Sequence, residues 1–435
     1  MKIFTPEISW HNRLPTLALD IEPRCEAGHY RIATGGNDCR VYIWLINPNT
    51  LEIRIRAGLR RHQKSVGAVR FSRQNILASG DDDGYIYLWK QKIEDPSNQQ
   101  AHTADTFMND DGFEDIETWQ HLKVLRGHIE DICDLAWSRD GAYLLSGSVD
   151  NSAILWDTTK GTKVWCSDQM KGYVQGVAID PHLQFFVTLS SDRTLRSFNF
   201  NDRKIINATR QMNIKGSPYK ALFCDDTVQT FCRRFEFSPD GQFLIAPTCR
   251  LVDRESKQTP ATGDSPTHPS SERINVFLVF RRHALNKPIH YYQTGKEVAL
   301  CVRFAPIVYK LRKSEQNFWG IPYRIVFAVA TTRSVIIYDS QQPTPIAYVS
   351  QIHLARLTDI SWSRDGRMLM ISSYDGYTSI ITFNRDEIGE LYTDALLDPV
   401  QEVPKEAPKE QAPPPPPPVK VPEPLTIRRF LVKRV

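Results

Sequence analysis

The sequence predicts an all-β fold, a seven-bladed β-propeller followed by a disordered, proline-rich C-terminal tail. One pattern recurs in residues 34–44, 79–89 and 146–156: a hydroxyl residue lies ten positions before a Trp, and an Asp lies six positions before it. Such a recurrence indicates a repeat architecture, in which neighbouring units stack to bury a shared core. The 435 residues are enough for seven four-stranded units, and 28 prolines, many of them near the end, mark the tail.

The clearest unit comprises residues 125–157, where three segments with period-two alternation are separated by turn signals. We expect one buried polar network to fix its register. In that network the His of the entering loop contacts the Asp of a tight turn and the Ser and Trp of neighbouring strands. The residues assigned to it are His128, Ser146, Asp150 and Trp156. This structural role is favoured over a catalytic one for the His–Asp pair.

The units on either side are weaker copies of this pattern. Unit one has the triplet Thr34, Asp38 and Trp44 but no obvious His. Unit four has an aromatic residue in the Trp position. The remaining assignments are, for unit two, His62, Ser79, Asp83 and Trp89 and, for unit four, Thr188, Asp192 and Phe198.

Units five to seven complete the ring. Unit five begins in residues 231–247, and its outer strand is expected at 274–280 after an insertion. Unit six is divided between residues 297–306 and 323–339, and unit seven spans 352–383. The first residues, KIFTPEISW, have no unit of their own. We expect them to form the outer strand of the last blade, because closure removes exposed strand edges.

The domain organisation follows from these assignments. The propeller is expected over residues 1–385, interrupted by an acidic insert at 93–122 and a Ser/Thr/Pro-rich insert at 250–273. A proline-rich disordered linker follows at 386–424, with eleven prolines from Pro399 to Pro424. Residues 425–435 form a basic segment suited to a β-strand.

Composition narrows the function classes. The net charge of +4 creates no strong global field for nucleic acid or membranes. No signal peptide or membrane-length apolar run is present, and the eight cysteines, without a CxxC pair, fit reduced thiols. Phosphate-loop, HExxH, GxSxG and Rossmann signatures are absent, and the 11 histidines show no metal-ligand spacing. We therefore predict a protein that is not an enzyme and uses no cofactor or metal.

The acidic insert is the first candidate binding segment. It carries eight carboxylates and no Lys or Arg, which produces a strong local negative potential for a basic partner. The alternative is a solvated loop, but three large aromatic residues within it favour docking. The residues assigned to partner binding are Asp110, Asp111, Glu114, Asp115 and Glu117.

The terminal segment LTIRRFLVKRV is the second candidate. Its β-branched, aromatic and basic residues alternate in a way that suits strand addition to a partner's sheet. A nuclear-import signal or a basic end without function is the alternative. The residues assigned here are Ile427, Arg428, Arg429, Phe430, Leu431, Val432, Lys433 and Arg434.

Arg233 and Arg234 form the third candidate. They lie where a loop enters the first strand of unit five, a position that can reach one face of the propeller. The alternative is a structural role in pairing neighbouring blades.

Several segments carry a family resemblance. The Gly127-His128 start and Trp156-Asp157 end of unit three resemble WD repeats. The opening KIFTPEISWHN, KGYVQGVAIDP (171–181), FCRRFEFSPDG (231–241) and residues 322–353 resemble the WD-repeat middle subunits of chromatin assembly factor one. The likeness covers roughly residues 1–385. The related histone-regulator propellers of replication-independent assembly are the nearest alternative.

This resemblance implies a nuclear, chromatin-associated, non-catalytic scaffold of a histone chaperone. The implied partners are the large and small subunits of chromatin assembly factor one, histones three and four, and the chaperone anti-silencing function one. DNA would be contacted only indirectly, and no membrane is involved. The family's chaperone-binding motif is similar to Arg428, Arg429, Phe430, Leu431 and Val432. A propeller adaptor of another class, such as a ubiquitin-ligase substrate receptor, is the alternative function.

Overall fold

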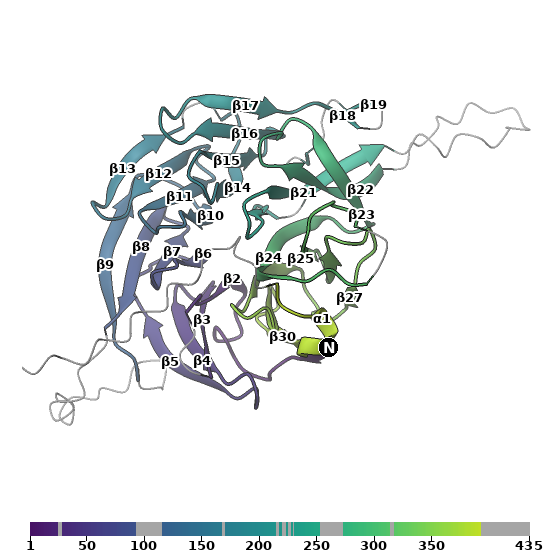
Figure 1. Cartoon of the computed structure of the whole chain (residues 1–435). Helices are drawn as coiled ribbons and strands as arrows, with labels where there is room; N and C mark the ends of the chain where they lie inside the picture. The colour runs from purple at the N-terminus through teal and green to yellow at the C-terminus, as the bar shows by residue number, and fades with distance from the viewer. Residues whose placement is uncertain are drawn as a thin grey trace, which may run out of the picture. The chain divides into compact units, whose positions relative to one another are not determined.

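The computed structural model describes residues 1–24, 28–92, 115–167, 170–214, 217–219, 223–224, 228, 230–252, 273–313 and 317–392. Residues 1–393 form one compact unit and residues 394–435 a second. In the first unit, seven four-stranded antiparallel sheets surround a central channel (Figure 1). The predicted seven-bladed propeller is therefore confirmed. No helix in the described ranges has the length and apolar character needed to cross a membrane.

Blades one to four run through the chain in order, each from its innermost to its outermost strand. Blade one contains β2 (Thr16–Ile21), β3 (Tyr30–Gly36), β4 (Val41–Ile46) and β5 (Ile53–Leu59), and blade two contains β6 (Val66–Phe71), β7 (Ile76–Asp81), β8 (Tyr85–Gln91) and β9 (Trp119–Arg126). Blade three contains β10 (Ile132–Trp137), β11 (Tyr143–Ser148), β12 (Ala153–Asp157) and β13 (Thr162–Cys166), and blade four contains β14 (Val174–Ile179), β15 (Phe185–Ser190), β16 (Thr194–Asn199) and β17 (Ile205–Thr209). A short hairpin, β18 (Met212–Ile214) and β19 (Ser217–Tyr219), follows blade four.

Blades five to seven complete the circle, and a four-residue helix, α1 (Arg385–Ile388), follows them. Blade five contains β20 (Glu236–Phe237), β21 (Phe243–Val252), β22 (Arg273–Arg281) and β23 (Pro288–Gly295), and blade six contains β24 (Ala299–Tyr309), β25 (Arg324–Thr331), β26 (Ser334–Asp339) and β27 (Ala347–Ser350). Blade seven contains β28 (Leu357–Trp362), β29 (Met368–Ser373), β30 (Thr378–Thr382) and β1 (Lys2–Phe4).

The first strand closes the ring as the sequence predicts. β1 pairs antiparallel with β30, with Ile3 opposite Ile381, and so supplies the outer strand of blade seven. Figure 1 shows the N-terminus beside α1 and β30. Inside the ring, β2 contacts both β6 and β28, so the first and last blades are neighbours. Closure leaves no blade face without a partner, which an open array of sheets would expose.

The hydrophobic core lies between neighbouring blades. Leu19, Ile32 and Trp44 of blade one pack against Met370 and Ile380 of blade seven. Comparable clusters of buried residues join blades one and two, two and three, three and four, four and five, and six and seven. Side chains on both faces of the inner strands are therefore buried, as in β14, β15 and β25, where every residue is buried.

Three expected segment boundaries need correction. β9 begins at Trp119, so the acidic insert ends several residues before the expected residue 122. β21 and β22 extend pairing to Val252 and Arg273, which shortens the second insert at both ends. The propeller also continues beyond 385, because Leu391 bridges to Tyr309 and the amide of Tyr392 donates to the carbonyl of Val308. The start of the proline-rich linker at 386 is therefore too early.

Candidate functional site

The four polar residues assigned to blade three lie together. His128 Nδ1 is 2.9 Å from Asp150 Oδ2, and His128 Nε2 is 2.7 Å from Ser146 Oγ. Trp156 Nε1 donates to the same hydroxyl at 2.8 Å. Burial alone would raise the pKa of Asp150, but hydrogen bonds from His128, Ser152 and the Ile129 amide lower it to about 2. The carboxylate is therefore held in its charged form by the blade itself.

Blade two has the same network with a different acid. His62 lies 2.7 Å from Asp81 Oδ2 and 2.6 Å from Ser79 Oγ, and Trp89 donates to Ser79 at 2.8 Å. The assignment of Asp83 was wrong. Asp81 ends the strand next to the imidazole and is buried, whereas Asp83 lies in the turn beyond and donates its amide to Asp81.

Blade one also has a His, which the sequence analysis missed. His11 Nδ1 lies 2.8 Å from Asp38 Oδ1, His11 Nε2 lies 2.9 Å from Thr34 Oγ1, and Trp44 donates to Thr34. His11 precedes the hydroxyl residue by 23 positions, whereas the separation is 18 in blade three. The longer entering loop obscures the spacing. In blade four, Met170 takes the place of the His and contacts Thr188.

The residues at the end of the acidic insert contact other residues of the propeller. Glu117 is buried, and its Oε1 lies 3.2 Å from Arg31 Nη2 and 3.1 Å from Arg56 Nε. Asp115 accepts from the Gly58 amide and pairs with Arg60 at 2.9 Å. These residues tie blade two to the outer part of blade one. Burial removes Glu117 from any surface that a partner could reach. Asp115 is exposed, and its assignment to partner binding stays a prediction.

A bulge recurs in the innermost strands. Pairing shifts by one residue in six blades, between Thr16/Ala18, Val66/Ala68, Ile132/Asp134, Val174/Gly176, Ala299/Cys301 and Leu357/Asp359. A bulge leaves one residue outside the ladder and re-aims the side chain that follows. The residue after each bulge occupies an equivalent place in the ring, and Arg234 takes this place in blade five, where it bridges to Cys301.

Arg234 satisfies the carbonyl groups that these bulges free. It donates from Nη1 to the carbonyls of Leu17 and Thr358 at 3.4 and 3.0 Å, and from Nη2 to the carbonyl of Gly67 at 2.6 Å. These three are the bulged residues of blades one, seven and two. One side chain from blade five therefore links four blades across the channel.

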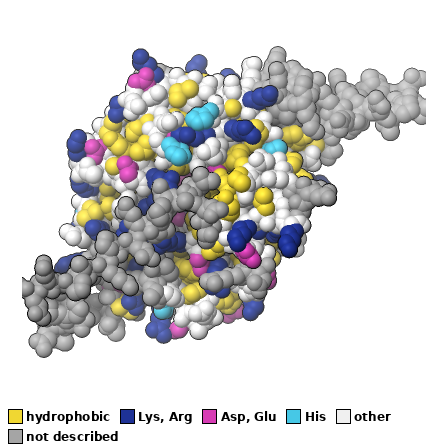
Figure 2. Space-filling model, in the orientation of Figure 1, with side chains coloured by type: hydrophobic (Ala, Val, Ile, Leu, Met, Phe, Trp, Pro, Cys, Tyr) yellow, Lys and Arg dark blue, Asp and Glu magenta, His cyan; other side chains and the backbone are white. Residues whose placement is uncertain are grey.

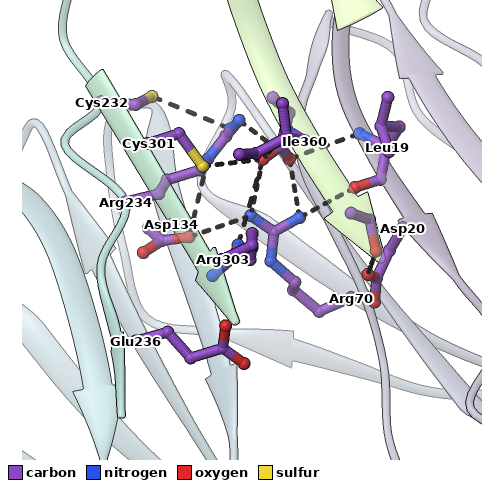
Figure 3. A network of polar contacts seen from close by, with 12 residues as sticks. Leu19, Asp20, Arg70, Asp134, Cys232, Arg234, Glu236, Cys301, Arg303 and Ile360 are labelled. Carbon is purple, nitrogen blue, oxygen red and sulfur yellow. Dashed lines mark hydrogen bonds and ion pairs between the residues drawn. The ribbon is translucent and has the colours of Figure 1, made fainter. Parts of the chain in front are cut away.

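A charged cluster surrounds Arg234 (Figure 3). Asp359 Oδ2 lies 3.0 Å from Arg234 Nη1 and 2.7 Å from Arg70 Nη1, and its Oδ1 lies 4.0 Å from Arg303 Nη2. Asp134 Oδ1 lies 3.6 Å from Arg70. The cluster draws on six blades, and its members are Asp20, Arg70, Asp134, Arg234, Glu236, Arg303 and Asp359.

Within the cluster, burial and neighbouring charges shift the pKa values in opposite directions. Burial alone would raise the pKa of Asp359, but Arg234, Arg70 and Arg303 hold it well below its usual value. Burial alone would lower the pKa of Arg70, but Asp359 and neighbouring carboxylates raise it. Burial raises the pKa values of the acids farther from the arginines, Asp20, Asp134 and Glu236.

The chemistry available in this cluster is binding and charge compensation. Burial raises the pKa of the neighbouring Cys301 thiol to about 12, which keeps it protonated at neutral pH. Within the described ranges, no group of three or more His, Cys, Asp or Glu side chains is arranged to hold a metal ion. Guanidinium groups paired with carboxylates hold the blades together and can present positive charge at the channel mouth.

Both arginines of the third candidate are buried. Arg233 donates from Nη1 to the carbonyls of Thr230 and Cys232 at 2.7 Å, and neither Arg233 nor Arg234 reaches the surface. Their assignment to partner binding was wrong, and the blade-pairing alternative describes Arg234. A sequence signal was present: Asp134, Arg234 and Asp359 each precede the Ser of an SxDG turn by four residues.

The other assigned residues lie outside the described part of the chain. They are, from the acidic insert, Asp110, Asp111 and Glu114 and, from the terminal segment, Ile427, Arg428, Arg429, Phe430, Leu431, Val432, Lys433 and Arg434.

The surface offers a further hollow away from the channel. A cavity of about 650 Å³ beside β23 is lined by aromatic and proline residues that include Tyr292, Phe318 and Pro343. Figure 2 shows Lys and Arg side chains interspersed with Asp and Glu on the face in view.

Comparisons with known proteins agree with this architecture. A chromatin assembly factor 1 subunit from Gallus gallus is 38% identical over 412 residues, which cover 89% of this chain and 69% of that protein. The corresponding subunit from Saccharomyces cerevisiae is 30% identical over 420 residues, covering 87% and 85%. Protein HIR1 of Kluyveromyces lactis is 26% identical over 410 residues, covering 87% and 42%.

A family model described as the CAF1B/HIR1 β-propeller domain matches residues 1–388, which includes every blade and α1. The relatives named for chromatin assembly factor 1 share more identity with the chain than the relative named HIR1. The resemblance noted in the sequence is thereby confirmed, and the chain belongs to the CAF1B/HIR1 β-propeller family.

Proposed function

We propose that this chain is a non-catalytic scaffold subunit of a nuclear histone chaperone complex that deposits histones three and four on replicated DNA. The observation that supports a scaffold most directly is the charged cluster in the channel, where three arginines and four acidic residues join six blades and compensate one another's charges. The sequence similarity to proteins named for chromatin assembly supports the proposed role in histone deposition.

In this proposal the propeller binds the large subunit of the complex, the small subunit is a further partner, and DNA is contacted only indirectly. The terminal segment 425–435 binds the chaperone anti-silencing function one by adding a strand to its sheet. Alternating faces support this role, with Ile427, Arg429 and Leu431 on one side and Arg428 and Phe430 on the other.

Deletion of residues 425–435 tests the tail. We expect the three-subunit complex to assemble normally from the truncated chain but to lose binding of the histone-loaded chaperone. Reconstitution from purified subunits, followed by titration with the chaperone, measures both properties separately. Unchanged chaperone affinity would remove the tail from the proposed function.

The charged part of this contact has its own test. Arg428→Ala with Arg429→Ala should weaken chaperone binding more at low salt than at high salt, because exposed charge contacts are screened. Lys405→Ala with Lys409→Ala is the matched control, since it removes two charges from the tail outside the segment. Equal losses for both pairs would indicate a nonspecific effect of charge.

The acidic insert supplies a second proposed contact, to a basic surface such as that of a histone. Asp110→Asn, Asp111→Asn and Glu114→Gln together should reduce retention of histones three and four by the reconstituted complex and flatten its salt dependence. A complex that retains histones equally well with this triple variant would show that the insert is a solvated loop.

A HIR1-type role in assembly independent of replication is a second candidate, because the matching family model covers both groups. Purification of the tagged chain from nuclei distinguishes the two roles by which companion subunits are recovered. Recovery of a ubiquitin-ligase scaffold instead would contradict both.

A further inference from the structure

Two cysteines from different blades meet near the channel cluster. Cys133 is the bulged residue of β10, so it lies outside the ladder of blade three, and it is buried. Cys232 comes just before the innermost segment of blade five, where the Arg233 amide donates to the carbonyl of Gln175 in blade four at 2.7 Å. The two thiols share a hydrogen bond in which Cys133 is the donor and Cys232 the acceptor. Both are free cysteines, so blades three and five are in contact here without a covalent link.

Two guanidinium groups lie next to Cys232. Arg234 Nη2 is 3.9 Å from Cys232 Sγ, and Figure 3 draws this contact as a dashed line. Arg233 follows Cys232 directly in the chain and is fully buried. Because a nearby cation favours a thiolate over a thiol, both groups stabilise the ionised sulfur. The hydrogen bond from Cys133, together with Arg234 and Arg233, therefore holds the pKa of Cys232 below its ordinary value.

Arg233 has no acidic partner in the part of the chain that the structure describes. Its Nη1 donates to backbone carbonyls, but its Nε and Nη2 atoms are buried without an acceptor. Burial lowers the pKa of Arg233, and the groups that oppose this shift include Cys224, Cys232 and Tyr173 rather than carboxylates. A buried cation without a counter-charge is costly. An ionised Cys232 supplies the negative charge that this guanidinium otherwise lacks.

A second thiol beside Arg234 has the opposite character. Cys301 is buried and donates from Sγ to Asp359 Oδ1 at 3.5 Å, and burial raises its pKa to about 12. Cys232 instead faces arginine, is only partly buried, and follows the exposed Phe231. It therefore combines a stabilised thiolate with access for a small solute, which are the two properties of an oxidation-sensitive cysteine.

We propose that Cys232 is a site of oxidation by peroxides and that Cys133 completes the reaction by forming a disulfide between blades three and five. The Cys232 thiolate attacks one oxygen of hydrogen peroxide, so an S–O bond forms as the O–O bond breaks. The hydroxide that leaves takes up the proton lost from the Cys232 thiol and becomes water. Cys232 is then a sulfenic acid next to a second thiol.

The second step joins the two sulfurs. The Cys133 sulfur attacks the Cys232 sulfur, an S–S bond forms, and the S–O bond breaks. The oxygen leaves as water with the proton of the Cys133 thiol. Two thiols thereby lose two electrons and two protons, and one hydrogen peroxide is reduced to two waters. The hydrogen bond from Cys133 to Cys232 already brings this pair together in the reduced chain.

Peptide mapping of the oxidised full chain tests the proposal. The purified chain is freed of reductant, treated with hydrogen peroxide at neutral pH, alkylated and digested without reduction. We expect mass spectrometry to find Cys133 linked to Cys232 as the main disulfide. No such link at a peroxide dose that oxidises Cys166, an exposed thiol at the end of β13, would overturn the proposal. A link from Cys232 to Cys224 instead would overturn the role of Cys133.

Reaction rates separate thiolate chemistry from exposure. Cys166 is more exposed than Cys232, so exposure alone predicts that Cys166 reacts faster. We expect Cys232 to react with hydrogen peroxide at least about threefold faster at neutral pH, because a lower pKa gives a larger thiolate fraction. Isotope-coded alkylation of the remaining thiols gives both rates in one sample. An equal or slower rate at Cys232 would contradict a stabilised thiolate.

Cys133→Ser tests the second step. Without this thiol, Cys232 should stop at the sulfenic acid, which a cyclic diketone probe traps and mass spectrometry locates. Cys39→Ser is the matched control and should leave the link between Cys133 and Cys232 unchanged. If the probe labels Cys232 no more strongly in Cys133→Ser than in the wild type, Cys133 does not complete the reaction.

Arg233→Met tests the cation. The pH profile of Cys232 alkylation should move upward by about half a unit or more, because the thiolate loses a neighbouring positive charge. Arg333→Met, at an exposed site, should leave the profile in place. An unmoved profile in folded Arg233→Met would remove that residue from the site, and circular dichroism shows whether the variant is folded. The map of the wild-type disulfide decides the proposal even if this variant does not fold, and it does not depend on the proposed function, because the chain is tested alone.

Discussion

Asp359 keeps its negative charge in the centre of the propeller, where burial alone would favour the neutral acid. Arg70 and Arg234 lie within 3.0 Å of it, and Arg303 lies 4.0 Å away. Its carboxylate also accepts from the Leu19 amide at 3.4 Å. One side chain thereby compensates three cations, so its loss affects every group around it.

We predict that Asp359→Asn destabilises the protein by about 3–5 kcal/mol, the usual cost of leaving a buried charge without its partner. Chemical denaturation measures the free energy of unfolding. Glu7→Gln is the control, because Glu7 is exposed, and it should change stability by less than about 0.5 kcal/mol. A small effect of the Asp359 change would mean that the arginines find other compensation.

The Asp150 carboxylate should make the stability of the protein depend on pH. Its pKa is about 2 in the folded chain and about 3.9 when unfolded. Because the folded value is lower, the carboxylate stabilises the fold above about pH 4, and this contribution is lost as the pH falls toward 2. Near neutral pH, the free energy of unfolding of the wild type should exceed that of Asp150→Asn by about 1–2 kcal/mol. Urea unfolding over a pH series should show that difference narrowing in acid. A constant difference would contradict the prediction.

At the scale of elements, short segments at both ends of the propeller pack on blades that are formed mainly by other parts of the chain. β1 adds the outer strand to blade seven. After blade seven, residues of α1 and the segment to Tyr392 return to blade six, where Ile388 is buried and the Lys310 amide donates to the carbonyl of Glu390 at 2.9 Å. Arg324 also donates to the carbonyl of Ile388. The propeller therefore depends on residues beyond its last strand.

Two truncations test this return segment. A chain that ends after residue 384 should be less stable than one that ends after 392 by about 2–4 kcal/mol, because Ile388 no longer covers apolar surface and Arg324 loses an acceptor. Denaturation of the two purified chains gives the difference directly. Ile388→Ala in the longer chain should reproduce part of the loss. Equal stability would show that the segment contributes no net packing energy.

At the scale of the whole molecule, the channel cluster joins blades that adjacent-blade packing does not. Hydrophobic clusters link neighbouring blades, such as seven with one, one with two and two with three. Nearest-neighbour contacts of this kind alone allow repeats to unfold in stages. Arg234 instead reaches from blade five to blades seven, one and two. Its contacts couple opposite sides of the ring, which favours unfolding as one unit.

Calorimetry of Arg234→Met tests this coupling. Wild type should unfold in a single transition with equal calorimetric and van't Hoff enthalpies. The variant leaves three carbonyls and one carboxylate without their donor, so its midpoint should fall by about 5 °C or more. Phe231→Met, at an exposed site near the same strand, is the control. A midpoint like that of wild type would mean that blade packing alone holds the ring.

Much of this architecture could be predicted because it is local. The alternation of apolar residues, the turn signals and the Ser–Asp–Trp spacing lie within single blades, and they indicated seven sheets and the closing role of the first residues. The same local reasoning placed His128 with Asp150. It failed at His11, where a longer loop changes the spacing, and at Asp83, where two nearby acids compete for one imidazole and only the backbone geometry favours Asp81.

By itself, the sequence determined the blades, their number and the family, because strand patterning and turn chemistry depend on neighbours along the chain. Only the tertiary structure decided what Arg234 does. Its acceptors at Leu17, Gly67 and Thr358 lie in three other blades and are backbone carbonyls, which carry no signature in side-chain identity.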